Sequence, residues 1–248
     1  MARSAAVPLV TAGTLALGLL GWQLLSYAVP PYLLPPPGAV VLRWGELVQS
    51  GVLGQDLAVT TEEAALGFAL ASVLALSLGY AVARLRVLEE LLAPYIAASQ
   101  AMPMVAFAPL LITWLGIGIL PKVLIAALII FFPILVNTVV ALRGIDRDLV
   151  DAARTDGASA GRILFHVEAP LALPIVLGGV KMGLTLAMTG ALVAEFIATD
   201  AGLGYLLNLG RTEYDGAMVF AAALSVAAVS ILAYACVTAV ERAVRRRV

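Results

Sequence analysis

Hydrophobic and polar positions alternate along this chain in long blocks. Six apolar runs of about 20 residues or more are separated by more polar stretches, and they cover approximately residues 5–29, 64–83, 91–115, 123–142, 171–198 and 217–240. A helix needs about 20 consecutive apolar residues to cross the hydrocarbon layer of a membrane. The pattern therefore predicts an all-α integral membrane protein with six transmembrane helices and both chain ends on one side.

The polar stretches divide the chain further. The first apolar run exceeds the core of a signal peptide, about 7 to 15 residues, and only Arg3 precedes it, so we expect a retained transmembrane helix. A proline-rich and then amphipathic stretch follows it, as expected for an interfacial segment. The predicted parts are an N-terminal transmembrane helix (1–30), an extracytoplasmic segment (31–61), a transmembrane core (62–241) with a polar segment at 143–170, and a basic tail (242–248).

Composition supports a membrane protein and excludes several other classes. Hydrophobic residues make up 62% of the chain and the mean hydropathy is +1.03, values too high for a water-soluble domain. The formal net charge of −1 argues against a nucleic-acid partner. Cys236 is the one cysteine and His166 the one histidine in the sequence, so we expect neither a disulfide within the chain nor a metal site.

Basic residues between the apolar runs predict the orientation in the membrane, because Lys and Arg are retained on the cytoplasmic side. One face of the predicted topology carries only Arg43, Lys122 and Arg211. The other face carries Arg3, Arg84, Arg86, Arg143, Arg147, Arg154, Arg162, Arg242, Arg245, Arg246 and Arg247. Both termini and the segment 143–170 are therefore predicted to be cytoplasmic.

The segment 143–170 is too long for a simple turn and carries helix signals. Asp146 or Asp148 can cap a first short helix, and Gly157 suits the left-handed position at its end. Ser159 can cap a second helix through Phe165 before the next span begins near Pro170. A helix, a glycine turn and a helix would present small and apolar residues to a partner in the cytoplasm. The alternative is a solvated loop that rests on its own helices.

The same segment resembles the EAA loop of bacterial ABC importer permeases. That pattern is Glu-Ala-Ala, three residues, Gly, nine residues, then Ile, any residue, Leu and Pro. Here the spacing is kept by Asp151-Ala152-Ala153, Gly157 and Val167-Glu168-Ala169-Pro170, with Asp for Glu, Val for Ile and Ala for Leu. Further stretches resemble the permeases that serve nitrate, taurine, alkanesulfonate, pyrimidine-precursor and riboflavin importers. They are Leu34 to Pro37, Gly67-Phe68, Pro103, Ala108 to Leu110, Trp114 to Gly118, Phe131 to Thr138 and Gly202 to Gly204.

The resemblance implies the type I ABC importer permease fold, with cytoplasmic coupling helices between the fourth and fifth spans. Two copies would form a homodimer in the bacterial inner membrane, surrounded by lipid, with two ATPase subunits and an extracytoplasmic solute-binding protein as partners. The chain would bind no cofactor, since it lacks the Gly-x-x-x-x-Gly-Lys-Ser/Thr loop, and ATP and Mg²⁺ would bind the ATPase. The implied ATPase-coupling residues are Asp151, Ala152, Ala153, Gly157, Ala158, Ser159, Phe165 and Pro170.

Polar and thioether side chains within the spans are the candidates for a translocation path, because a polar group in hydrocarbon usually faces a cavity or another helix. They are Gln100, Met102, Met104, Thr113, Asn137, Thr138, Thr185, Met188, Thr189 and Glu195. Each could instead pack or hydrogen-bond between helices. Glu195 is either a gate or docking contact at the outer mouth, or a structural carboxylate that caps backbone or pairs with Arg211. Lys181 is expected to snorkel, whereas Gly183 and Gly190 are expected to permit close helix packing.

Other function classes fit less well. A secondary transporter needs ionisable groups near the bilayer centre, whereas Glu195 lies toward one end of its span. A membrane enzyme needs convergent catalytic groups, which one histidine and scattered acids do not supply. A scaffold protein would account only for the docking segment. The stretch from Ala98 to Leu111 looks closer to permeases for riboflavin and thiamine pyrimidine precursors, with taurine, alkanesulfonate or nitrate as the alternative solutes.

Overall fold

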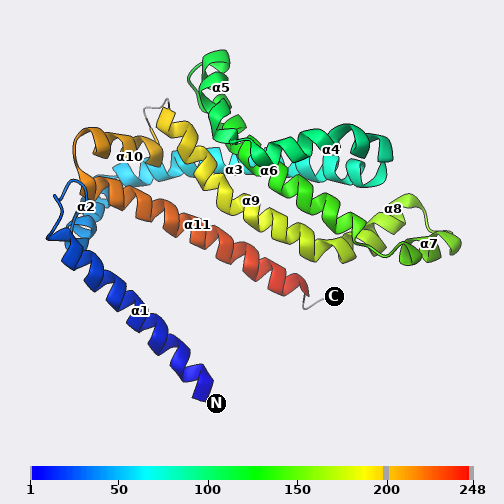
Figure 1. Ribbon diagram of the computed structural model, residues 1–248, viewed down its shortest axis with the longest axis horizontal. Coiled ribbons are helices and arrows are strands. Elements are labelled where there is room, and N and C mark those ends of the chain that lie inside the picture. Colours follow the sequence, from blue (N-terminus) through cyan, green and yellow to red (C-terminus); the bar gives the residue numbers. More distant parts are fainter. Residues whose placement is uncertain (1, 198–200, 246–248) are drawn as a thin grey trace. The chain divides into compact units, whose positions relative to one another are not determined.

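The computed structural model describes the backbone of residues 2–197 and 201–245, and the side chains in those ranges apart from residues 2–9, 100, 240, 241 and 243–245. All regular elements in this described part are helical, and it contains no strand (Figure 1). The chain divides into two compact units, one of residues 1–59 and 200–227 and one of residues 60–199 and 228–248. Helices α3 (Val52–Arg84) and α11 (Gly216–Arg245) contribute to both units.

The first unit contains α1 (Ala2–Ser26), α2 (Pro37–Gln49) and α10 (Leu203–Thr212). Helix α2 begins at a proline. The lack of an N–H costs no hydrogen bond there, because N–H groups in the first turn of a helix have no partner within the helix. Its buried face consists of Val40 and Leu47, while the Trp44 indole nitrogen donates a 3.0 Å hydrogen bond to Ser225 Oγ. Helix α10 was not predicted from the sequence.

Polar contacts fix the ends of helices within the first unit. Asp56 Oδ1 accepts a 2.8 Å hydrogen bond from the backbone N–H of Gly202, which has φ +107°. Arg43 on α2 pairs with Asp215 at 2.8 Å and with Glu46 at 2.9 Å. The hydrogen bond to Glu46 and the charge of Asp215 raise the pKa of Arg43, although partial burial opposes the shift.

The second unit is built around α6 (Ile119–Arg143), which lies beside α9 (Ala169–Ile197) along its length (Figure 1). Glycines make this close approach possible. A Cβ added to Gly190 would lie 2.7 Å from Ala126 Cα, and one added to Gly179 would lie 2.6 Å from Asn137 Cβ. Gly183 has equally little space, facing Ile130 and Ile134. The predicted packing role of Gly183 and Gly190 is therefore confirmed.

Helix α3 packs on α6 by the same device. A Cβ on Gly67 would lie 2.7 Å from Ala126 Cβ, and one on Gly79 would lie 2.8 Å from Thr138 Cβ. Ala126 is therefore touched by a glycine from α3 and by a glycine from α9. Small residues let helix backbones approach closely where lipid supplies no hydrophobic driving force for association. These contacts hold α3, α6 and α9 as one layer of the second unit.

The run at 91–115 was expected to form one span, and the structure shows it as two helical parts joined at a sharp bend. The chain forms α4 (Arg86–Ala101), a 3₁₀ turn (Met104–Phe107) and α5 (Ala108–Leu115). The axes of the two helical parts are bent by 92°. Pro103 and Pro109 lack the N–H groups that would continue the hydrogen-bond ladder through the break. By contrast, Pro133 lies inside the continuous helix α6 and does not interrupt it, although a proline inside a transmembrane run can break a helix.

Several helix ends also differ from the sequence-based ranges. Helix α3 begins at Val52 rather than near residue 64, and α6 begins at Ile119, so Lys122 lies within a helix instead of a loop. Helix α9 starts at Ala169, and the predicted end of that span at residue 198 lies outside the described residues. The predicted ranges of these helices are too short because they stop at polar residues such as Glu63 and Lys122. These polar residues are tolerated in the helices because other side chains pair with them.

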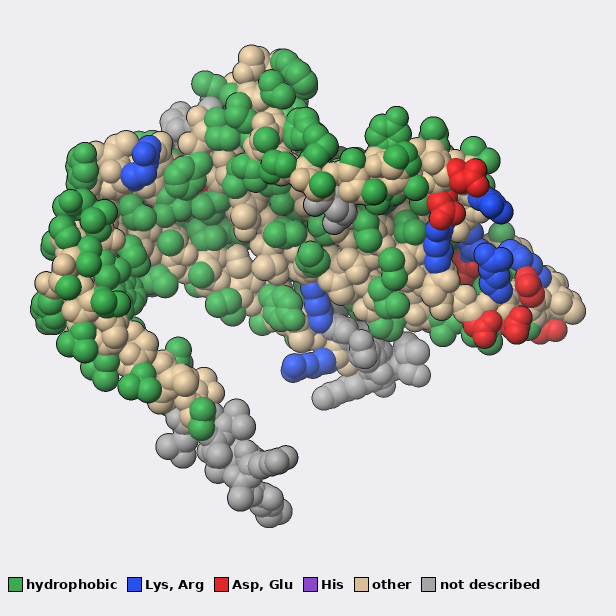
Figure 2. All heavy atoms as spheres, in the orientation of Figure 1, with side chains coloured by type: hydrophobic (Ala, Val, Ile, Leu, Met, Phe, Trp, Pro, Cys, Tyr) green, Lys and Arg blue, Asp and Glu red, His purple; other side chains and the backbone are tan. Residues whose placement is uncertain are grey.

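Four described helices are long and apolar enough to cross a membrane, or five spans if the bent α4–α5 pair counts as one. They are Val52–Arg84, Ile119–Arg143, Ala160–Ile197 and Gly216–Ala239. The apolar part of α1, Val10–Ser26, is shorter. In the second unit, Figure 2 shows charged side chains gathered around α7, α8 and the start of α4, whereas hydrophobic side chains cover much of the remaining visible helix surface.

Candidate coupling segment and translocation residues

The coupling segment, residues 143–170, begins with α7 (Arg147–Thr155). Asp146 caps this helix, since its Oδ1 accepts a 3.0 Å hydrogen bond from the N–H of Asp148. Val150 is buried, whereas Asp151 and Ala152 are exposed. The Asp151 carboxylate accepts a 2.8 Å hydrogen bond from Arg154, one turn further along the same surface. One face of α7 is thus anchored and the other is free to meet a partner.

Gly157 ends α7 as predicted, with φ +77°. Its N–H donates to Arg154 O and the N–H of Ala158 donates to Ala153 O, both at 3.0 Å. These two bonds form a Schellman motif, in which a left-handed residue closes the last turn of a helix. A Cβ at Gly157 would meet no atom within 4 Å, so the backbone conformation alone requires glycine here.

The second half of the segment differs from the prediction. Ser159 occupies the N-cap position of α8 (Ala160–Ile163), but its side chain makes no capping hydrogen bond. Helix α8 then continues through a π-helical turn, η2 (Leu164–Glu168), directly into α9, so Pro170 lies inside a helix rather than at the start of one. The π turn also leaves Phe165 with 71% of its surface exposed.

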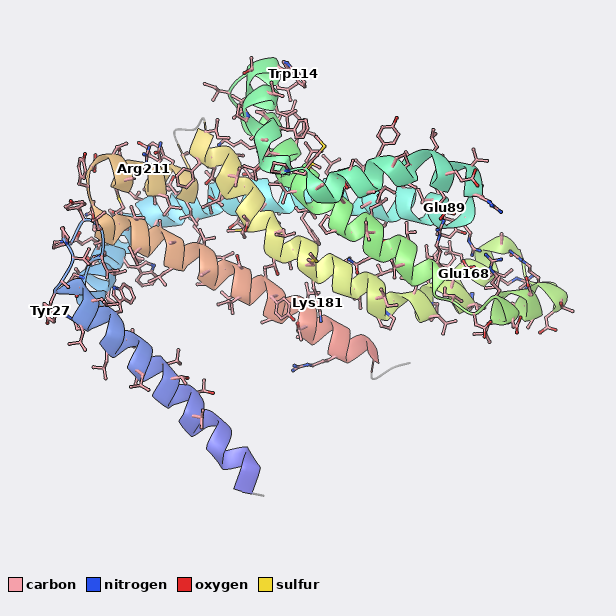
Figure 3. All side chains as sticks on the ribbon, in the orientation of Figure 1. Tyr27, Glu89, Trp114, Glu168, Lys181 and Arg211 are labelled. Atoms are coloured by element: carbon pink, nitrogen blue, oxygen red, sulfur yellow. The ribbon has the colours of Figure 1, made fainter. Side chains whose placement is uncertain are left out.

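An ion pair connects this segment to the end of α3. Glu168, only 2% exposed, pairs with Arg84 at the end of α3, and Arg84 also lies over the Tyr80 ring at 5.5 Å from its centroid. Figure 3 shows Glu168 where η2 passes into α9. A surface hollow of about 390 Å³ lies beside the pair, lined by Tyr80, Arg84, Arg154, Ala158, Ala160 and Ile163.

A second link at the same end joins α3, α4 and α6. Arg143, the last residue of α6, pairs with Glu89 on α4 and donates a 3.2 Å hydrogen bond to the carbonyl of Val82 on α3. Sequence reasoning did not predict the ion pairs that Arg84, Glu168 and Glu89 form here. Glu168 occupies the position of the EAA pattern at which any residue is allowed, directly before an apolar run. A charged residue at that position was the signal that the sequence offered.

Comparison with known proteins settles the family. Residues 71–246 match the family described as binding-protein-dependent transport system inner membrane component. The chain belongs to this family. By its family and its relatives this protein is an ABC transporter permease, and by its family and its apolar helices it is a multi-pass membrane protein. Permeases of this kind are transport components rather than enzymes.

Individual relatives of the permease cover most of its length. It is 46% identical to a riboflavin transport system permease protein of Chloroflexus aurantiacus, over 92% of this chain and 86% of the relative. It is 32% identical to a formylaminopyrimidine transport permease protein of Halalkalibacterium halodurans, over 89% and 88% respectively. A Bacillus subtilis permease named for aliphatic sulfonate transport is 33% identical over 89% of this chain and 81% of the relative.

Some candidate path residues of the permease lie between helices or are buried, and others lie on exposed surfaces. Asn137 and Thr138 lie against Gly179 and Gly79 at the helix interfaces, and each donates a 2.8 Å hydrogen bond to a carbonyl one turn earlier in α6. Met188 is buried and Met104 is half-buried. The exposed candidates are Met102, Thr113, Thr185 and Thr189, while the side chain of Gln100 lies outside the described residues. Their role in a path stays a prediction.

Glu195 belongs to a buried group of four residues that the sequence did not bring together, here called the carboxyl cluster: Thr60, Glu63, Lys122 and Glu195. Thr60 Oγ1 donates a 2.7 Å hydrogen bond to Glu195 Oε1, and Lys122 Nζ donates a 2.7 Å bond to Glu63 Oε1. The alternative partner considered for Glu195, Arg211, donates to Asn208 at 2.9 Å.

Lys181 has an aromatic partner. Its Nζ lies 5.7 Å from the centroid of the Tyr234 ring, and Figure 3 shows it on α9 on the side toward α11. A cation over a ring face is attracted by the negative charge density of that face. This contact provides a specific site for the ammonium group, which the sequence suggested only as a snorkelling cation.

Proposed function

We propose that this permease acts as a homodimer in the bacterial inner membrane, with two ATPase subunits on the cytoplasmic side and an extracytoplasmic protein that delivers the solute. The description of the family, which names a binding protein and the inner membrane, supports both the location and the dependence. ATP and Mg²⁺ would bind the ATPase, because the sequence of this chain has no phosphate-binding loop.

The proposed topology has six spans: α1, α3, the bent α4–α5 pair, α6, the continuous α8–α9 helix and α11. Both termini and the coupling segment would then be cytoplasmic. The charges around α7, α8 and the start of α4 support this side, because basic residues are retained in the cytoplasm. Arg43 and Arg211 would lie on the outer side.

The proposed coupling residues lie on a surface suited to docking. Asp151 and Ala152 on α7, together with Phe165 and Pro170 in the continuous helix, are exposed, while Ala153 and Ala158 are half-buried around the Gly157 turn. Because α8, η2 and α9 form one helix, a displacement of the docked segment would be transmitted directly to the layer of α3, α6 and α9. The Arg84–Glu168 pair would carry the same displacement to α3.

A solute path would form between two copies. Thr113, Thr185 and Thr189 are exposed in the single chain, and a second copy would enclose the surfaces that carry them. The hydroxyls of Thr113 and Thr185 already bond to carbonyls in their own helices, at 2.8 and 3.1 Å. Such a surface would bind a passing solute weakly, as transport requires.

We propose a vitamin-type heterocycle, riboflavin or a related ring system, as the solute. The observation that carries this proposal is the 46% identity to a riboflavin transport permease over 92% of the chain. The formylaminopyrimidine permease is a second relative named for a heterocyclic compound. Aliphatic sulfonates are the second candidate, favoured by the Bacillus subtilis relative at 33% identity.

The test is copurification in mild detergent followed by an ATPase assay. We expect an ATPase subunit to copurify, and its hydrolysis rate to rise when a riboflavin-loaded binding protein is added in lipid nanodiscs. A sulfonate-loaded binding protein is the matched comparison. If only the sulfonate-loaded protein stimulated hydrolysis, the solute would be a sulfonate instead of riboflavin. A permease that purifies without any ATPase, and supports no nucleotide-dependent uptake, would contradict the importer proposal itself.

A further inference from the structure

A hollow of about 270 Å³ lies along one face of α11, toward the carboxyl end of that helix and within the second unit. Its described lining consists of Tyr234, Ala235, Thr238, Ala239 and Arg242. Tyr234, Thr238 and Arg242 follow one another at a spacing of four residues, so their side chains share one stripe of the helix. A water molecule takes about 30 Å³ of liquid, so the hollow has room for several waters or for a group of the size of a phosphate.

The stripe is rich in hydrogen-bond donors. The guanidinium group of Arg242 carries five N–H donors and accepts no hydrogen bond, and the hydroxyls of Tyr234 and Thr238 can also donate. Thr238 Oγ1 is buried and bonds to no described group, although a threonine in a helix can bond to the carbonyl one turn earlier. A buried hydroxyl without a partner costs free energy, which a ligand atom in the hollow would recover. An anion whose oxygens only accept hydrogen bonds is the matching ligand.

The contact between Lys181 and Tyr234 indicates the depth of the hollow in the membrane. On the proposed topology α9 reaches the outer surface at its Ile197 end, and Lys181 lies about 24 Å back along the helix axis, at 1.5 Å per residue. Tyr234 lies at the level of Lys181, whose Nζ is 5.7 Å from the ring centroid and which points toward α11 in Figure 3. Arg242 is about 12 Å further along α11.

This depth places the two ends of the stripe in different layers. The hydrocarbon core of a bilayer is about 30 Å thick, and the headgroups add roughly 5–7 Å on each side. Tyr234 then lies just inside the inner edge of the hydrocarbon, where aromatic residues are common in membrane proteins. Arg242, at a depth of about 36 Å, lies among the headgroups, the layer that contains the lipid phosphates.

The sequence beyond the hollow is basic. Three further arginines follow Arg242 at positions 245–247, against one acidic residue, Glu241. Basic residues directly beyond the cytoplasmic end of a transmembrane helix attract the anionic lipids of that leaflet. The surroundings of the hollow therefore favour a lipid that carries a net negative charge.

We propose that this hollow binds the phosphate of an anionic phospholipid in the cytoplasmic leaflet. The Arg242 guanidinium and the Thr238 hydroxyl donate to the phosphate oxygens, and Tyr234 contacts the first carbons of an acyl chain. The depth of Arg242 favours a lipid headgroup over a phosphate ion from the cytoplasm. The choice of leaflet rests on the proposed topology, whereas the donors and the hollow do not.

Native mass spectrometry of the full chain tests the site. The protein is released from mixed micelles that contain equal amounts of phosphatidylglycerol and phosphatidylcholine, and the retained lipid is identified. We expect retention of phosphatidylglycerol in preference to phosphatidylcholine. Arg242→Gln should weaken phosphatidylglycerol binding about tenfold, because a charge-assisted hydrogen bond is lost. Thr238→Val keeps the shape of the side chain and should weaken binding about threefold.

Arg86→Gln is the matched control. Arg86 is an arginine on the same proposed side of the membrane, its side chain is 89% exposed, and it pairs with Glu90 on the surface. This variant should retain phosphatidylglycerol as the unmodified chain does. Equal retention by Arg242→Gln and the unmodified chain, or an equal loss in Arg242→Gln and Arg86→Gln, would overturn the proposal.

Two further observations distinguish other occupants of the hollow. Displacement of phosphatidylglycerol by an excess of inorganic phosphate would assign the site to a free ion. A change of oligomeric state in Arg242→Gln, with lipid retention unchanged, would assign the hollow to an interface between copies. Either result would overturn the lipid site.

Thermal unfolding gives a second measure of the same binding. Added phosphatidylglycerol should raise the unfolding temperature of the unmodified chain more than that of Arg242→Gln, because a ligand that binds only the folded state stabilises it. An equal rise in both would contradict the proposed site. None of these measurements needs an ATPase or transport, so the lipid site and the importer function can fail separately.

Discussion

At the scale of single residues, Gly157 shows how one backbone angle can matter more than any side-chain contact. Its surroundings are open, yet φ +77° is a conformation that β-branched residues adopt only with strain of roughly 1–3 kcal/mol. The Schellman motif that depends on it determines the direction in which the chain leaves α7. A change here alters the coupling segment without touching the transmembrane core.

We therefore expect Gly157→Val to lower solute uptake strongly while ATP hydrolysis by the complex continues. The measurement is uptake and hydrolysis in the same proteoliposomes. Gly161→Ala is the matched control, because Gly161 also has no neighbour within 4 Å but has no positive φ. Normal uptake by Gly157→Val would show that the turn is not needed for coupling.

Asp151 lies on the exposed face of α7, where it pairs with Arg154 of the same helix. Reversing its charge with Asp151→Lys should reduce the amount of ATPase that copurifies with the permease, whereas Asp151→Asn should have a smaller effect. Quantitative mass spectrometry of the purified complex measures both. An unchanged complex in both variants would assign docking to the apolar residues of the segment, above all Phe165.

The Arg84–Glu168 pair is the second residue-scale feature. Removing one partner of a buried ion pair costs about 3–5 kcal/mol, because the remaining charge is left without compensation. Glu168 is nearly inaccessible and Arg84 is one-third exposed, so we place the effect of Arg84→Gln at the lower end of that range. Denaturation in detergent measures it. Glu90→Gln breaks an exposed pair and should change stability by less than about 1 kcal/mol; equal effects would contradict the structural role of the buried pair.

At the scale of elements, α6 is the helix on which the second unit depends. Glycines of α3 and α9 pack directly against three of its residues, Ala126, Asn137 and Thr138. Neighbouring helices in a membrane associate through such close van der Waals contact rather than through a hydrophobic driving force. The same α9 continues into the coupling segment without a break, so the element that packs on α6 is also the element that meets the proposed partner.

Adjacent glycines on α9 give a matched test of this packing. A Cβ on Gly179 would lie 2.6 Å from Asn137 Cβ, whereas a Cβ on Gly178 would meet nothing within 4 Å. Gly179→Ala should destabilise the protein by about 1–3 kcal/mol through overpacking, and Gly178→Ala should be close to neutral. Thermal unfolding of the two variants in the same detergent compares them. Equal stability would mean that α6 and α9 can move apart at little cost.

At the scale of the whole molecule, the proposed topology places the coupling segment and the chain ends in the cytoplasm. Cys236 is the single cysteine, so replacing it with serine gives a background for site-specific labelling. Asp156→Cys at the end of α7 should react with an impermeant maleimide only from the cytoplasmic side, and Glu213→Cys after α10 only from the outside. Labelling of intact cells and of inverted vesicles measures this. The reverse pattern would invert the proposed topology.

The sequence by itself determined the helical class, the membrane location, the family and the turn at Gly157. These properties depend on the local order of residues: apolar runs long enough to span a bilayer, a motif with fixed spacing, and a glycine where a helix must end. Only the tertiary structure showed the 92° bend between α4 and α5, the partners of Gly67, Gly79, Gly179 and Gly190, the Arg84–Glu168 pair and the carboxyl cluster. Residues 60 and 63 on α3 are far in the chain from residues 122 and 195, and only helix packing decides which buried polar groups become neighbours.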